Sequence, residues 1–187
     1  KLRSELGWPA DKRIALHVGH LRKSRQLDSF VRLQQQGRFQ CVIVGSTSTK
    51  KEKPVIERLR QAGCVVMDRY IANIAVVYQA ADVYLFTLTD PDVDAGTMWK
   101  NRKGAVDMPL SVLEAQACGV PVITTRFGAL PRFFTSDPSV QFSEEPARHL
   151  EQAPLAFATA ETKQVVPDWQ DITRELVQTY EKLMAQR

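Results

Sequence analysis

The sequence lacks any hydrophobic run that approaches the roughly 20 residues of a membrane-spanning helix. Its first residues, Lys1 to Glu5, also lack the apolar stretch of a secretion signal. We therefore expect a cytoplasmic protein, and peripheral membrane association is left open. The formal charge of +4 is mild and is not gathered into a basic stripe with interleaved aromatic residues. A nucleic-acid partner is not expected.

Cysteine and histidine are also scarce. The three cysteines, Cys41, Cys64 and Cys118, lie in or beside apolar runs without paired spacing, and their odd number argues against a disulfide framework. We expect them to be buried free thiols. The three histidines show no ligand spacing, so the sequence predicts no structural zinc site.

One acidic cluster, Asp90-Pro-Asp92-Val-Asp94, invites interpretation as a metal site. A calcium loop of the EF-hand type would need Gly at its sixth position and Glu at its twelfth, where this chain has Ala95 and Asn101. Basic residues follow the cluster, and this mixture is typical of a solvated loop. We expect no metal.

Short apolar runs alternate with helix-like segments, and this alternation predicts an α/β fold. The runs are almost continuously hydrophobic, which is typical of strands buried on both faces of a parallel sheet. We predict a doubly wound, mostly parallel sheet in a single domain over residues 1–187. The predicted strands are Ile14–Val18, Cys41–Val44, Cys64–Met67, Asp82–Phe86 and Val120–Thr124.

Capping residues place some of the helices. Ser24 is a suitable cap for a helix over 25–36, and Gly37 can end that helix in a left-handed conformation. Asp168 can cap a terminal helix with an apolar stripe that should dock on another surface. Segment 143–166 is predicted to be irregular because Pro146 and two further prolines interrupt any long helix.

Another predicted helix begins at Pro109 and ends before Gly119. It carries one carboxylate, Glu114, in otherwise apolar surroundings, on the same face as Leu110 and Ala117. A solvated Glu would be expected on the opposite face. A polar ligand at the helix start would explain its position, and so would a satisfied structural carboxylate.

Loops at the carboxyl ends of parallel strands are the usual ligand sites of such a sheet. The first loop carries His20, Arg22, Lys23 and Arg25 before a helix, so cations and free backbone N–H groups could hold a phosphate. A solvated basic cluster is the alternative. Gly45, after the second strand, would let a ligand approach the backbone.

A nucleoside diphosphate would satisfy both regions together. The N–H groups of Leu110 and Ser111 lie at a helix start, where they have no partner within the helix and can meet a diphosphate. Glu114 lies about one turn further along, and its two oxygens can accept from both hydroxyls of a ribose.

These motifs together resemble the donor-binding half of family 4-type glycosyltransferases with the GT-B fold. The resemblance implies a Rossmann-like domain that binds a UDP- or GDP-linked sugar for retaining transfer to an acceptor hydroxyl, without cofactor or metal. It also implies that an N-terminal domain absent from this chain binds the acceptor, and that 167–187 is a terminal docking helix. The matching segments are Gly19-His-Leu with Arg25, Cys41–Gly45, Val77–Asp82, Pro109–Thr125 and Phe127–Pro131.

The resemblance also implies residue roles. Arg25 and Lys23 are expected to be catalytic, stabilising the leaving diphosphate, and Arg69, Tyr70 and Ile71 to lie near the base. The remaining donor-binding residues are expected to be Gly19, His20, Gly45, Asp107, Leu110, Ser111 and Glu114.

The chain departs from the family pattern at two positions. His20 stands where the family usually has arginine, and Val106 stands at the place of the first acid of a conserved pair, with Asp107 beside it. These departures motivate the alternative of a noncatalytic nucleotide-binding or interaction module with the same fold.

Overall fold

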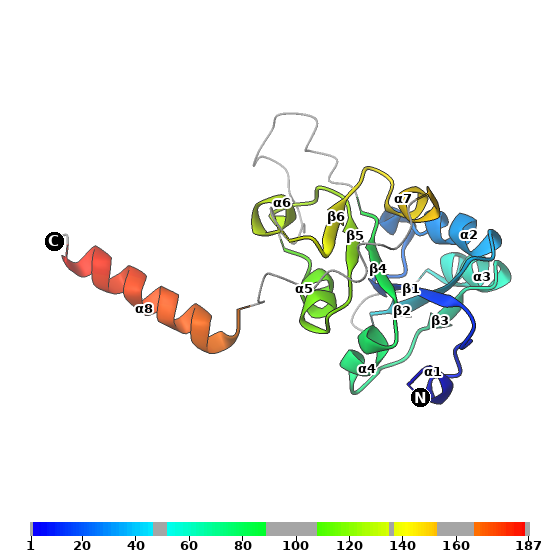
Figure 1. The fold of residues 1–187 in the computed structure, drawn as a ribbon, viewed down its shortest axis with the longest axis horizontal. Coiled ribbons are helices and arrows are strands. Elements are labelled where there is room, and N and C mark those ends of the chain that lie inside the picture. Colours follow the sequence, from blue (N-terminus) through cyan, green and yellow to red (C-terminus); the bar gives the residue numbers. More distant parts are fainter. Residues whose placement is uncertain (1, 47–51, 89–107, 135–136, 153–166, 186–187) are drawn as a thin grey trace.

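A single parallel sheet organises the computed structural model, which describes residues 2–46, 52–88, 108–134, 137–152 and 167–185 (Figure 1). The sheet has six strands in the order β3-β2-β1-β4-β5-β6, and every pairing is parallel. The predicted doubly wound fold is confirmed. The strands are β1 (Arg13–Gly19), β2 (Phe39–Gly45), β3 (Val65–Met67), β4 (Val83–Phe86), β5 (Val122–Thr124) and β6 (Val140–Phe142).

Helices cover both faces of this sheet. Helix α2 contacts both α3 and α7 on one face, and α4 contacts α5 on the other (Figure 1). Each face therefore has its own hydrophobic core. The helices are α1 (Leu2–Glu5), α2 (Asp28–Gln35), α3 (Lys53–Gln61), α4 (Ile74–Gln79), α5 (Leu110–Ala117), α6 (Leu130–Phe133), α7 (Pro146–Gln152) and α8 (Trp169–Ala185).

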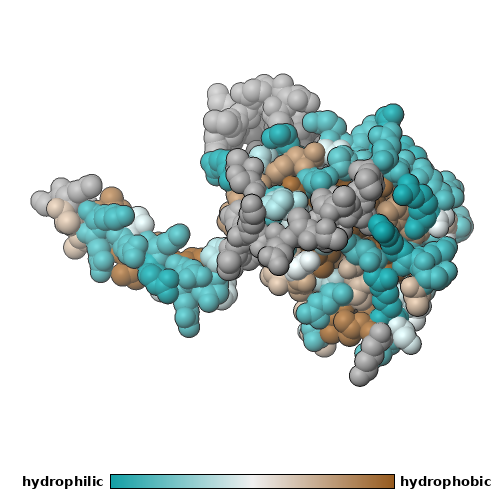
Figure 2. Space-filling view, viewed as in Figure 1, coloured by the Kyte–Doolittle hydropathy of each residue, from teal (hydrophilic) through white to brown (hydrophobic). Residues whose placement is uncertain are grey.

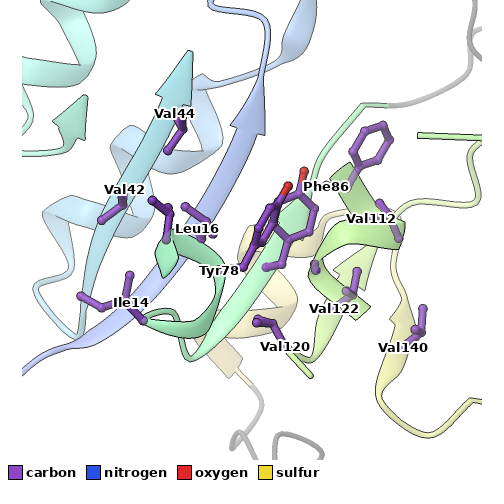
Figure 3. Close-up of a cluster of buried hydrophobic side chains, with 14 of the residues drawn as sticks. Ile14, Leu16, Val42, Val44, Tyr78, Phe86, Val112, Val120, Val122 and Val140 are labelled. Atoms are coloured by element: carbon purple, nitrogen blue, oxygen red, sulfur yellow. The ribbon is translucent and has the colours of Figure 1, made fainter. Parts of the chain in front are cut away.

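Alternate residues of the central strand β1 enter the two cores. Ile14 and Leu16 belong to the cluster drawn in Figure 3, whereas Ala15 belongs to the cluster beneath α2 and α3. All three side chains are fully buried. This two-sided burial explains the nearly continuous apolar runs, because neither face of the strand meets water.

The predicted strands occur within one or two residues of their expected positions, but β6 was not predicted. It has only three residues, and its central residue is the polar Gln141. The preceding Ser139 is buried and donates a hydrogen bond to the Gln116 side chain of α5 at 3.0 Å. A strand held by a polar network leaves no apolar run in the sequence.

The helix predicted over 25–36 starts later than expected. Residues Lys23–Arg25 form one 3₁₀ turn, and Gln26 adopts a left-handed conformation with φ of 54°. This conformation interrupts the helical path, so α2 begins at Asp28. Gly37, with φ of 76°, has the left-handed conformation predicted for it.

Proline also acts differently from the prediction in segment 143–166. Pro146 is the first residue of α7 and does not break a helix. A proline fits this position because the first N–H of a helix has no partner within the helix. The prediction of an irregular segment is therefore wrong for residues 146–152, and residues 153–166 lie outside the described residues.

The terminal helix α8 projects away from the sheet in Figure 1. Its cap is as predicted, since the backbone N–H groups of Gln170 and Asp171 both donate to Oδ1 of Asp168 at 2.8 Å. Its apolar stripe is exposed: Trp169 is 82% and Leu176 is 53% exposed, and Figure 2 shows brown side chains along this helix. None of the described helices combines the length and the apolar character of a membrane span.

Candidate functional site

The carboxyl end of β1 is followed by the predicted phosphate loop. In this loop, Nη2 of Arg25 lies 3.4 Å from Nδ1 of His20, so the guanidinium donates toward the imidazole. Burial and the neighbouring Arg25 and Arg22 lower the pKa of His20, so its imidazole is neutral at pH 7. Burial also lowers the pKa of Arg25, which nevertheless stays charged. The predicted pair is therefore together, and Arg25 supplies its positive charge.

Some of the backbone N–H groups of this loop are already bonded within the protein, although free N–H groups were predicted there. The N–H of Lys23 donates to Oε2 of Glu52 at 3.1 Å, and the N–H of Arg25 donates to the carbonyl of Arg22 at 3.0 Å. Glu52 also donates its own N–H to the carbonyl of Leu21. The start of α3 therefore braces the loop and uses an amide that was expected to face a phosphate. The Lys23 residue itself is exposed.

The glycines of the site allow close packing of side chains within the protein. A Cβ at Gly45 would lie 2.6 Å from Cδ1 of Leu21, which is itself buried. A Cβ at Gly19 would lie 2.9 Å from Nε2 of His17. The structure thus gives both glycines a packing reason, and their roles in ligand binding stay predictions.

The face of α5 that carries Glu114 is the solvent side of the helix, not an apolar face as predicted. Leu110 is 67% exposed, and Glu114 and Ala117 are exposed as well. Val112 and Ala115 instead form the buried side. An exposed leucine made this face look apolar in the sequence.

Glu114 nevertheless has a specific partner. The hydroxyl of Tyr78 donates to Oε2 of Glu114 at 2.7 Å, joining α4 to α5. The Tyr78 side chain is fully buried in the cluster of Figure 3. Burial raises the pKa of Tyr78, so the phenol keeps its proton and remains a donor.

A second buried tyrosine joins α5 to β1. The hydroxyl of Tyr84 donates to the carbonyl of Val18 at 3.2 Å, and it is also hydrogen-bonded to the side chain of Ser111. The first turn of α5 therefore meets the end of β1, at the point where the sheet order passes from β1 to β4. Ligands of doubly wound sheets bind at such a reversal of strand order.

The residues predicted near a base follow β3, the edge strand that β2 and β1 separate from β4. Arg69 is exposed and Tyr70 is 76% exposed, whereas Ile71 packs partly against the core. Two exposed side chains at this edge of the sheet are accessible to a ligand. Asp107 lies outside the described residues.

His17 is a residue that sequence reasoning missed. Its Nδ1 donates to the carbonyl of Leu85 at 3.1 Å, while Nε2 is buried without a hydrogen-bond partner among the described residues. Burial, mainly, lowers the pKa of His17 to about 4. The only signal in the sequence was a histidine within an apolar run. This signal could not show that His17 would bond to Leu85 of the neighbouring strand β4.

The described residues offer no metal cluster and one relevant hollow. No group of three or more His, Cys, Asp or Glu side chains gathers among them, but Asp90, Asp92 and Asp94 lie outside that part of the chain. The absence of a metal stays a prediction. A hollow of about 690 Å³ lies between α2 and α7, and of the predicted site residues it includes only Lys23.

Comparison with known proteins adds a family and a fold. A family model described as "Glycosyl transferases group 1" matches residues 12–158. No curated protein matches the chain significantly. Among solved structures, a sucrose-phosphate synthase from Thermosynechococcus elongatus is 22% identical with a TM-score of 0.71, over 100% of this chain and 49% of that chain.

Two further structures are similar over most of this chain. A glycosyltransferase from Rickettsia africae ESF-5 is 15% identical with a TM-score of 0.57, over 80% of this chain and 39% of that one. A UDP-forming α,α-trehalose-phosphate synthase from Burkholderia xenovorans is 13% identical with a TM-score of 0.55, over 80% and 38%. The chain thus spans about half or less of these proteins, and the likeness shows a shared Rossmann-like fold.

Proposed function

Because the chain belongs to the group 1 glycosyltransferases, we propose that it binds the nucleotide diphosphate-sugar donor in a retaining transfer to an acceptor hydroxyl. The observation that carries this proposal is that the first turn of α5, the end of β1 and the Arg25 loop meet where the strand order of the sheet passes from β1 to β4. The first turn of α5 is tied through Tyr84 to the end of β1, and the Arg25 loop follows that end directly. A helix start and a cation beside each other favour a diphosphate.

The proposed sugar transfer requires the protein to stabilise the leaving diphosphate. Breaking the bond between sugar and phosphate leaves negative charge on the diphosphate, and fixed donors aimed at that charge lower the barrier. Arg25 is the principal cation because the imidazole of His20 is neutral. Lys23 and the N–H groups of Leu110 and Ser111 complete the proposed set.

The nucleoside would extend from the diphosphate along the same edge of the sheet. Glu114 is exposed one turn into α5 and would accept from the ribose hydroxyls. Arg69, Tyr70 and Ile71 would line the base, which we expect to be uracil or guanine. We further propose that the acceptor binds to a separate domain, since the chain matches only 49% of the sucrose-phosphate synthase.

A noncatalytic nucleotide-binding module is the second candidate. Two observations favour it. The imidazole of His20 is neutral, and the Lys23 amide already donates to Glu52, so both groups attract a phosphate less strongly than a charged side chain and a free amide would. Turnover of a labelled nucleotide-sugar by the protein that joins this chain to an acceptor-binding domain would exclude this candidate. Binding without any turnover would favour it.

Calorimetry with the 187-residue chain tests donor binding. Uridine, guanosine and adenosine diphosphates are compared with their monophosphates, and one of the diphosphates should bind more tightly than its monophosphate. Arg25→Ala should weaken the binding of that diphosphate by about 10- to 100-fold, the range for a lost hydrogen bond to a charged group. The affinity for the monophosphate should change less.

Arg58→Ala is the matched control, because it removes the same charge from α3, where Arg58 pairs with Asp28 in an exposed ion pair. This variant should bind every nucleotide like the wild type. If Arg25→Ala does the same, or if the chain binds none of the nucleotides, the donor site is not where we propose it.

A further inference from the structure

We infer that Tyr78 is a positioning residue that holds the Glu114 carboxylate in the orientation needed to bind the ribose of a nucleotide. This inference rests on the proposed function and deepens it. Tyr78 would touch no ligand, and it would act only through Glu114. The residue lies in α4, whereas the ribose-binding carboxylate lies in α5.

The contact itself is short and directional. The Tyr78 hydroxyl donates to Oε2 of Glu114 at 2.7 Å, from a side chain with no exposed surface. Hydrogen bonds to a carboxylate are stronger than those between neutral groups. The other oxygen, Oε1, has no hydrogen-bond partner among the described residues, and the Glu114 residue is exposed. One oxygen is therefore anchored from within the protein while the other remains accessible to a ligand.

An anchored carboxylate binds a diol at lower cost than a mobile one. Glutamate has several rotatable bonds, and fixing such a side chain on binding loses conformational freedom. Tyr78 has already fixed it, because its ring is locked in the core and lies 5.8 Å from the ring of Tyr84. Loss of the hydroxyl should therefore weaken ribose binding by about 3- to 10-fold, the equivalent of one immobilised side chain.

Tyr84 provides a matched control. It is equally buried, and its hydroxyl bonds to Val18 and Ser111 and not to Glu114. Tyr84→Phe removes the same atom from the neighbouring ring. Any effect of this variant on affinity should be the same whether or not the nucleotide carries ribose hydroxyls.

The experiment measures the Kd of uridine and guanosine diphosphates and of their 2′,3′-dideoxy counterparts by calorimetry. Tyr78→Phe should weaken the binding of the ribonucleotide about 3- to 10-fold and leave the Kd of the dideoxynucleotide unchanged. In a chain that already carries Glu114→Gln, adding Tyr78→Phe should cause little further loss, because both changes affect one contact. Glu114→Asp withdraws the carboxylate from Tyr78 and provides a second variant with the same expected ribose dependence.

The outcomes separate the inference from the proposed function. A loss in Tyr78→Phe that is equal for both kinds of nucleotide, or no loss in a folded variant, overturns the positioning role. If Glu114→Gln still shows a ribose-dependent loss in that case, the proposed donor site stands. If the wild type binds no nucleotide, or Glu114→Gln shows no ribose dependence, the ribose role of Glu114 fails and the inference fails with it.

Discussion

Replacing His17 should change how the stability of the protein depends on pH. The imidazole is buried near the end of β1, where its ring lies close to the rings of Phe30 and Tyr84, and its Nε2 has no partner among the described residues. Burial lowers its pKa from 6.5 to about 4; the hydrogen bond to the Leu85 carbonyl acts against this shift, and the positive charge of Arg25 acts with it. The native state therefore keeps His17 neutral at pH values where the unfolded chain protonates it.

The sign follows from proton binding. Between about pH 6.5 and about pH 4 the unfolded state binds one proton more than the native state at this residue, so stability falls as the pH falls through this window. The full shift corresponds to about 3 kcal/mol, of which about 2 to 3 kcal/mol should be lost by about pH 4.5. Below the native pKa no further loss is expected from His17.

Urea unfolding followed by circular dichroism at several pH values measures this effect. His17→Leu removes the titrating group, so the free energy of unfolding of the variant should fall less between about pH 7.5 and about pH 4.5, by about 2 to 3 kcal/mol. Carboxylates elsewhere titrate in both proteins and cancel in the difference. Parallel pH profiles of the two proteins would refute the reasoning.

Two further predictions concern Gly45 and His20. Gly45→Ala should lower the free energy of unfolding by about 1 to 3 kcal/mol, because its Cβ would lie 2.6 Å from Leu21, and urea unfolding should show that Leu21→Ala relieves most of this cost. Strictly additive effects in the double variant would show that the two residues do not clash. Nucleoside diphosphate affinity should rise as the pH falls below about 6.5, because protonated His20 adds positive charge beside Arg25. Calorimetry of the wild type against His20→Asn cancels the titration of the ligand, and a constant ratio of the two Kd values would count against a phosphate role for His20.

The fold could be predicted largely because burial on both faces leaves a strong signal. Runs such as Cys41–Val44 are apolar at every position, as a central parallel strand requires. The signal fails at β6, where Gln141 interrupts three residues held by a polar network. It is ambiguous at Pro146, because proline stops a helix from inside and suits its first position equally well.

The site was harder to predict, because its details depend on contacts between distant residues. The Lys23 amide looked free until Glu52, 29 residues further along the chain, was seen to accept from it. The spacing of residues along α5 places Glu114 on the same face as Leu110, but spacing alone could not show that this face is exposed to solvent. Tyr78 and Glu114 come from different helices, 36 residues apart, so no local pattern links them.

The seam between β1 and β4 has a consequence for how the protein folds. Among the hydrogen bonds that cross it are one from the backbone of Ile14 to Asp82 and one from His17 to the carbonyl of Leu85, and each of these joins residues 68 positions apart. The first three strands can pair with one another before this long loop closes, and such nonlocal contacts slow folding. The proposed donor site lies on both sides of the seam. An intermediate that contains only β1, β2 and β3 would have no donor site, so nucleotide binding during refolding would report closure of the seam.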